Sequence, residues 1–193
     1  MGQKVNPVSM RMGINKYWES TWFEKKHYPT LLKEDHTIRT YIEKNYSIAG
    51  ISSVNIERAA DNLRIIIHTS KPGVLIGKKG ADIEKLKNGI GKLSDKNVSL
   101  DIKEIKKPEI DATLLADSIA KQLEKRIAFR KAMKRSGMSA MKLGAKGIKI
   151  VCGGRLGGAE IARTEKFSDG SVPLHTLRAC LLYTSPSPRD VEE

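Results

Sequence analysis

The sequence is poor in several residue types that would point to particular classes of protein. Aromatic residues make up 5% of its 193 residues, and it contains two cysteines and four histidines. Cys152 and Cys180 lie far apart without a CxxC spacing or a neighbouring histidine, so we expect neither a disulfide framework nor a metal site. Apolar runs fall short of the roughly 18 residues that span a membrane. Residues 1–16 lack the apolar segment of a signal peptide, so we expect a cytoplasmic protein without membrane contact.

The residue sets that support catalysis are also missing. The stretch from Gly73 to Lys79 is similar to a phosphate-binding P-loop, but its spacing is one residue short, and Lys79 stands where that motif needs a hydroxyl for Mg²⁺. The histidines are scattered without an HExxH spacing, and no G-x-S-x-G turn occurs. We therefore predict that the chain is not an enzyme and has no catalytic residue, no cofactor and no small-molecule substrate.

Acidic residues are few relative to basic ones. The chain has 35 Lys and Arg against 22 Asp and Glu, a net charge of +13, which favours polyanion partners, first of all nucleic acid. Residues 121–149 contain ten basic residues and one acid. On a helix, Arg126, Arg130 and Lys134 would share one face, where like charges repel unless a partner's phosphates relieve them. A solvated basic face is the alternative, but such faces usually interleave glutamate.

The motif Ile76-Gly77-Lys78-Lys79-Gly80 separates a strand-like run at 63–69 from a helix-like run at 81–90. Its two glycines lack a Cβ and tolerate backbone angles that other residues resist. The first N–H groups of the following helix would point at the same place and favour an anion there. With two lysines in the loop of so basic a chain, we expect this anion to be a nucleic-acid backbone.

The periodicity of apolar residues predicts two groups of elements. In the first half we expect a helix at 36–46, a hairpin of strands at 53–58 and 63–69, a short helical turn at Pro72-Gly73, a helix at 81–90 and a strand at 97–105. In the second half, Asp111 is a plausible N-cap for a helix whose buried stripe would be Leu115, Ile119, Leu123 and Ile127.

Helical character continues over 129–143, with an expected kink near Ser136-Gly137 and a stop at Gly144. Strands are expected at 148–152, 160–167 and 172–178, with Asp169-Gly170 as a tight turn between the last two. Residues 1–26 form a basic arm with several aromatic residues, of which Trp18 and Trp22 are expected to be packing anchors rather than platforms for bases.

Ile-Gly-Lys-Lys-Gly, placed after a hairpin and before an amphipathic helix, resembles the GxxG loop of a type II KH domain, which clamps single-stranded RNA backbone. Further stretches at 1–7, 143–148, 154–163 and 172–178 resemble the family of third proteins of the bacterial small ribosomal subunit. The resemblance covers about residues 1–179.

This resemblance implies an α+β fold in two domains. A type II KH domain, with a three-stranded sheet, helices on one face and a GxxG loop, would precede a second α+β domain of two helices on a small, incomplete, mostly antiparallel sheet. The expected divisions are a basic arm at 1–26, the KH domain at 27–107 and a truncated C-terminal domain at 108–179. Residues 180–193 depart from the family pattern, and their Ser-Pro-Ser-Pro run is unsuited to a strand. We therefore expect the second domain to be less stable than the first.

The family is implied to be a structural constituent of the small-subunit head. It binds small-subunit rRNA and mRNA, and it neighbours small-subunit proteins ten and fourteen. Residues implied to face mRNA where it enters the ribosome, and to assist passive unwinding, are Arg130, Lys131, Lys134 and Arg135. Residues implied to bind rRNA are Gly77, Lys78, Lys79, Gly80, Lys4, Arg155, Arg163 and Arg178. The alternative is a free-standing KH protein that regulates transcripts, although such a protein would not need the basic arm.

Overall fold

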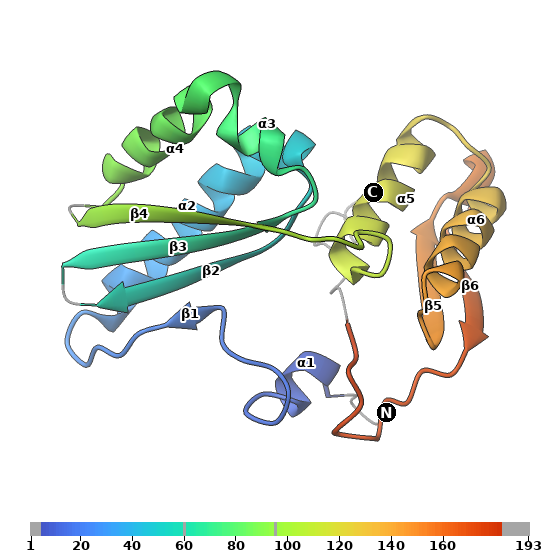
Figure 1. Cartoon of the computed structure of the whole chain (residues 1–193). Coiled ribbons are helices and arrows are strands. Elements are labelled where there is room, and N and C mark those ends of the chain that lie inside the picture. The colour runs from blue at the N-terminus through green and yellow to red at the C-terminus, as the bar shows by residue number, and fades with distance from the viewer. Residues whose placement is uncertain (1–4, 60, 95, 183–193) are drawn as a thin grey trace. The chain divides into compact units, whose positions relative to one another are not determined.

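The computed structural model describes residues 5–59, 61–94 and 96–182, and the predicted departure at 180–193 therefore lies largely outside the described residues. The chain divides into two compact units (Figure 1). Residues 17–106 form the first unit, and residues up to 16 together with those from 107 onward form the second. None of the described helices is long and apolar enough to cross a membrane.

The first unit follows the predicted order of helices and strands. Its elements are β1 (Ser20–Thr21), α2 (Tyr28–Tyr46), η1 (Ser47–Ala49), β2 (Ile51–Ala59), β3 (Asn62–Thr69), α3 (Pro72–Ile76), η2 (Lys78–Gly80), α4 (Ala81–Gly91) and β4 (Asn97–Glu104). The described strands form a sheet in the order β1-β2-β3-β4. β2 and β3 are the predicted antiparallel hairpin, while β1 and β4 run parallel to their neighbours. The short β1 extends the expected three-stranded sheet.

A single apolar cluster joins the sheet of the first unit to its helices. Alternating side chains of the strands face this cluster, as the pattern of the sequence predicts. Helices α2, α3 and α4 all contribute to it, so they cover the same face of the sheet (Figure 1). The members contributed by the helices are Ile38, Ile42, Leu75, Leu86 and Ile90, all completely buried. This packing fixes the loop between α3 and α4.

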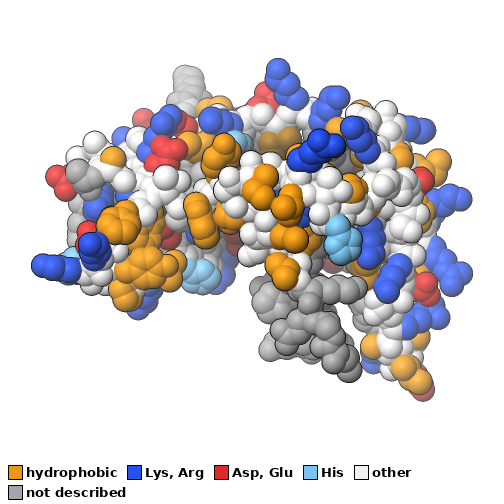
Figure 2. All heavy atoms as spheres, turned by 90° about the horizontal axis from the view of Figure 1, so that it is seen from below, with side chains coloured by type: hydrophobic (Ala, Val, Ile, Leu, Met, Phe, Trp, Pro, Cys, Tyr) orange, Lys and Arg blue, Asp and Glu red, His pale blue; other side chains and the backbone are white. Residues whose placement is uncertain are grey.

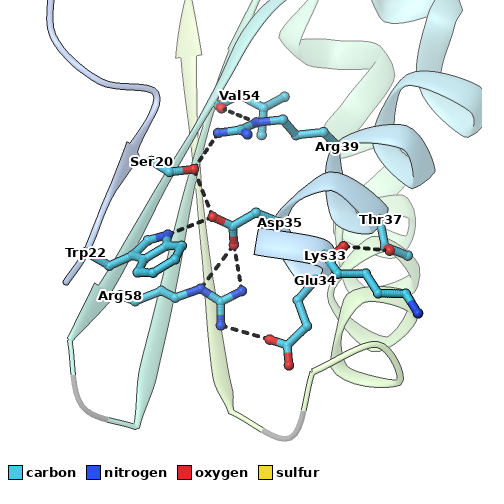
Figure 3. A network of polar contacts seen from close by, with 9 residues as sticks. All are labelled: Ser20, Trp22, Lys33, Glu34, Asp35, Thr37, Arg39, Val54 and Arg58. Atoms are coloured by element: carbon cyan, nitrogen blue, oxygen red, sulfur yellow. Dashed lines mark hydrogen bonds and ion pairs between the residues drawn. The ribbon is translucent and has the colours of Figure 1, made fainter. Parts of the chain in front are cut away.

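A buried carboxylate ties the segment before α2 to the sheet (Figure 3). Asp35 is completely buried on α2, and its Oδ2 accepts hydrogen bonds from Ser20 Oγ and Trp22 Nε1, both at 2.8 Å. Arg58 of β2 donates to Asp35 Oδ1 from Nε at 3.0 Å and from Nη2 at 2.6 Å. Because the buried charge is paired and hydrogen-bonded, it is tolerated in the core. Trp22 is thus an anchor as predicted, whereas the Trp18 side chain is 70% exposed.

The second unit contains α1 (Pro7–Met10), α5 (Ala112–Glu124), α6 (Phe129–Lys142), β5 (Gly147–Gly154), η3 (Leu156–Gly158) and β6 (Arg163–Gly170). Asp111 caps α5 as predicted, since its Oδ1 accepts from the backbone N–H groups of Thr113 and Leu114 at 3.0 and 3.2 Å. Of the expected stripe, Ile119 is buried, and Leu115 and Leu123 pack against it. Ile127 was wrongly assigned to this stripe, because α5 ends before it and its side chain is 38% exposed.

The break between the two long helices of the second unit lies earlier than predicted. It falls between α5 and α6, where Arg126 adopts a left-handed conformation with φ of 59°. The kink expected near Ser136-Gly137 is wrong, because both residues lie buried within the continuous helix α6. Gly144, with φ of 103°, follows the end of α6 and confirms the predicted stop.

The predicted hairpin at the end of the chain is also wrong. β5 pairs with β6 in an antiparallel register from Gly147 opposite Gly170 to Gly154 opposite Arg163, so Asp169-Gly170 ends a strand rather than joining two. Residues 172–178 are not a strand. A physical reason is the completely buried Arg11, whose guanidinium donates to backbone carbonyls of this segment at 2.9 to 3.2 Å. These carbonyls, which belong to Pro173, Leu174, Thr176 and Ala179, bind a side chain in place of a neighbouring strand.

Candidate nucleic-acid interface

The GxxG loop has the backbone that its glycines were expected to supply. Gly77 has φ of 69° and ψ of −174°, and Gly80 has φ of 81° and ψ of 5°. A Cβ on Gly77 would collide with the carboxylate of Asp82. The Gly77 N–H donates to Gly73 O at 3.0 Å, which caps the short helix α3 where the loop begins. The chain therefore turns sharply into α4, with Gly77 and Gly80 partly exposed at the turn.

The electrostatics at the start of α4 suit an anion. Gly80 is its N-cap and has no side chain that caps the first N–H groups. The first turn of a helix is favourable to phosphate when those N–H groups are free. Lys78 is exposed beside them, and Lys79 lies in the same turn, η2. Asp82 and Glu84 in the first turn of α4 work against an anion here, and of the two Asp82 is paired with Lys85 at 3.1 Å.

Apolar side chains adjoin the loop. Val74 and Ile76 of α3 are 43% and 41% exposed, which leaves an apolar surface beside the turn. Tyr46 lies against the other end of the loop, with its hydroxyl donating to Asp82 O at 3.5 Å. Burial raises the pKa of the Tyr46 phenol above its usual value. The phenol thus remains a neutral donor at physiological pH.

Helix α6 carries a second basic surface. Its buried side consists of small or flexible residues, while Arg130, Lys131, Lys134 and Arg135 are all exposed. Lys and Arg side chains are spread over the face of the molecule drawn in Figure 2. The predicted stripe that includes Arg126 is wrong, because Arg126 precedes the helix in a left-handed conformation. The basic side of α6 thus begins at Arg130.

The structure brings together residues that the sequence analysis assigned to two different contacts. Arg130 of α6 and Arg163 of β6 place their guanidinium carbons 5.6 and 5.8 Å from the centre of the Phe129 ring. Both also approach Glu165 Oε1, at 3.9 Å from Arg130 Nη2 and 3.6 Å from Arg163 Nε. Neither Phe129 nor Glu165 was predicted as a site residue. Side chains alternate between the two faces of β6, and Glu165 and Phe167 lie on the more buried face. This alternation is the pattern in the sequence that could have indicated Glu165.

The remaining predicted residues lie apart from this group in the chain. Arg155 is exposed and donates from Nε to Ala159 O at 2.8 Å, which orders the turn η3. Arg178 is exposed on the segment that Arg11 holds. Lys4 lies outside the described residues. Within the described ranges, no group of three or more His, Cys, Asp and Glu side chains could hold a metal ion.

Comparison with known proteins accounts for both units. The KH domain family matches residues 37–110, and the family described as ribosomal protein S3, C-terminal domain, matches residues 119–186. The first match contains the GxxG loop, and the second contains α6, β5 and β6.

Relatives named small ribosomal subunit protein uS3 match nearly the whole chain. The protein of Parvibaculum lavamentivorans is 60% identical over 184 residues, which are 95% of this chain and 78% of the relative. That of Rhodospirillum centenum is 57% identical over 183 residues, 95% of this chain and 81% of the relative. That of Gluconobacter oxydans is 55% identical with the same two coverages. The chain therefore belongs to the family of small ribosomal subunit protein uS3, whose members are ribosomal proteins and not enzymes.

Proposed function

We propose that this chain is a structural component of the small ribosomal subunit that binds rRNA and also contacts mRNA where it enters the ribosome. The observation that carries the proposal is the exposed basic side of α6, with Arg130, Lys131, Lys134 and Arg135, in a domain of ribosomal type. Family membership supports the ribosomal part, and the charge of α6 supports the contact with a mobile RNA strand.

Helix α6 would hold mRNA through its phosphates. Arginine and lysine contacts to phosphate position a strand without reading its sequence, as a passage for any message requires. As the ribosome moves along mRNA and its paired strands separate, the cations of α6 would hold the single strands and keep them from pairing again. This would assist unwinding passively. No bound nucleotide is needed for such a role.

The GxxG loop would bind rRNA through the open backbone around Gly77 and Gly80, with Lys78 and Lys79 adding charge. Further rRNA contacts are proposed for the basic residues Lys4, Arg155, Arg163 and Arg178. We also propose that the chain works in the cytoplasm beside small-subunit proteins ten and fourteen. Sedimentation tests the assembly: the protein should travel with small subunits, whereas a free-standing regulator of transcripts would remain at the top of the gradient.

The mRNA contact has its own test in the salt dependence of binding. Each phosphate contact to single-stranded RNA contributes about 0.7 to the slope of log K against log salt concentration. Lys134→Ala should therefore lower the slope measured with the full chain and an unstructured oligouridine by about 0.7. Lys142→Ala, at the far end of α6, is the matched control and should leave the slope unchanged. An unaltered slope for Lys134→Ala would refute the contact.

A further inference from the structure

Helix α6 and strand β6 line an open, shallow pocket of about 260 Å³ in the second unit. Its apolar walls come from Phe129, Met133 and Phe167, and its polar edge includes Arg130, Lys134 and Glu165. Farther along α6, Gly137 lets the Phe167 ring approach the helix backbone closely. The pocket lies toward the N-terminal part of the helix, beside the cations proposed to hold RNA phosphates.

Glu165 is unexpected on such a surface. Its carboxylate repels phosphate and lies within 4.0 Å of two arginines that phosphate would otherwise attract. A carboxylate only accepts hydrogen bonds, so it finds no donor on an ionised phosphate, a single hydroxyl donor on the ribose 2′ carbon, and N–H donors on the edges of bases. Among the four RNA bases, guanine presents two such donors side by side, at N1 and at the exocyclic amine, which match the two oxygens of a carboxylate.

The residues that line the pocket are of the kinds that bind bases. Aromatic side chains and arginine guanidinium planes are the groups on which unpaired RNA bases stack. The volume lies just below the roughly 300 Å³ at which pockets for drug-sized ligands begin, so it suits a single base rather than a larger ligand. Phe129 is half-buried, and the guanidinium groups of Arg130 and Arg163 lie over its ring. A base that enters stacks on these planes or takes the place of one of them on the ring.

We propose that this pocket binds one guanine of single-stranded RNA, with Glu165 accepting the two N–H groups of the base. Without RNA, Glu165 neutralises Arg130 and Arg163. When the nucleotide enters, its flanking phosphates take Arg130 and Arg163, with Lys134 assisting, and the released carboxylate takes the base. In this arrangement Arg163 contacts the entering strand rather than rRNA, because it shares Phe129 and Glu165 with Arg130. This inference rests on the RNA contact proposed for α6 and adds to it a modest preference at one nucleotide, compatible with passage of any message.

Fluorescence anisotropy of the full chain with a labelled oligouridine, and with the same oligomer carrying one central guanosine, tests the proposal. The unmodified chain should bind the guanosine oligomer about fivefold more tightly than oligouridine. This ratio of affinities is smaller than the one that a well-made bidentate contact to a base produces, because Glu165 is partly exposed. Glu165→Ala should abolish this ratio, and it should also bind oligouridine more tightly because a repelling charge is gone. Glu165→Gln, which keeps the shape and one acceptor, should reduce the ratio and checks that the loss does not arise from misfolding.

Glu109→Gln is the matched control for charge, since Glu109 is exposed in the same unit and outside the pocket, and it should keep the ratio. Equal affinities of the unmodified chain for the two oligomers would overturn the guanine pocket while leaving the phosphate contacts of α6 intact. A ratio that persists in Glu165→Ala would overturn the role of Glu165. Failure of the unmodified chain to bind either oligomer would overturn the proposed mRNA contact as well.

Discussion

Gly77 shows how one residue determines the shape of the GxxG loop. Its φ of 69° with ψ of −174° belongs to a region of backbone space that is open essentially to glycine alone. The space that a side chain would need is also filled, because Asp82 lies against the Cα of Gly77. The sequence pattern indicates that glycine is needed here, and the coordinates give two independent reasons.

We expect Gly77→Ala to lower the free energy of unfolding of the first unit by about 1–3 kcal/mol, the usual cost of such a strained residue. The measurement is urea unfolding followed by tryptophan fluorescence, since Trp18 and Trp22 both belong to the first unit. Gly73→Ala is the matched control: Gly73 lies in α3 with open space around it, so alanine there should be neutral or slightly stabilising. Equal effects of the two substitutions would contradict this explanation of the loop.

Helix α6 illustrates how an element serves packing and binding at once. Its buried side contains Ala132, Ser136, Gly137 and Ala140, small residues that let it lie close to β5 and β6. Gly137 allows the closest approach, where a Cβ would overlap the Phe167 ring. The opposite side is thereby free to carry long cationic side chains, and the element that presents charge to RNA is held by residues without charge.

Gly137→Ala tests the packing role of α6, at the position where a Cβ would overlap the Phe167 ring. Alanine is favoured over glycine inside a helix by about 1 kcal/mol, but overpacking a tight contact costs about 1–3 kcal/mol. We expect the second effect to prevail, so the thermal unfolding midpoint of the second unit should fall. Gly91→Ala, in α4 with no atom near its added Cβ, should not lower the midpoint of the first unit. A raised midpoint for Gly137→Ala would show that Phe167 moves aside without cost.

The two units of the molecule differ in the size of their cores. The described cluster of the first unit joins three helices to three strands and includes many completely buried aliphatic side chains. That of the second unit has Ile119, Met133 and Ile150 at its centre, with partly exposed residues around them. Because burial of apolar surface is the main favourable contribution to folding, the second unit has less to hold it together.

Hydrogen exchange read by mass spectrometry should show this difference directly. We expect backbone amides of β5 to exchange through openings of lower free energy than those of β3, since local stability follows the contacts of each unit. β3 is the internal reference, as it is paired on both sides within the described sheet. Equal protection of β3 and β5 would mean that the two units unfold together and that core size does not rank them.

The order of elements in the first unit could be predicted because its apolar residues alternate cleanly in the strands and recur at helical spacing in α4. The predicted helix at 36–46 misses the first two turns of α2, where the buried residue is the charged Asp35 rather than an apolar one. The predicted strand at 172–178 fails for a related reason. Its backbone carbonyls accept hydrogen bonds from Arg11, which is more than 160 residues away in the sequence. A local sequence pattern cannot indicate a partner at that separation.

The sequence by itself determined the basic character of the protein, the GxxG loop and its place before a helix, and the cap at Asp111, because each depends on composition or on residues close together in the chain. Tertiary structure alone decided where the second helical region breaks, which carbonyls Arg11 holds, and that Arg130, Arg163 and Glu165 meet around Phe129. These features depend on distances between segments that are remote in the chain, and such distances are set only when helices and strands pack against one another.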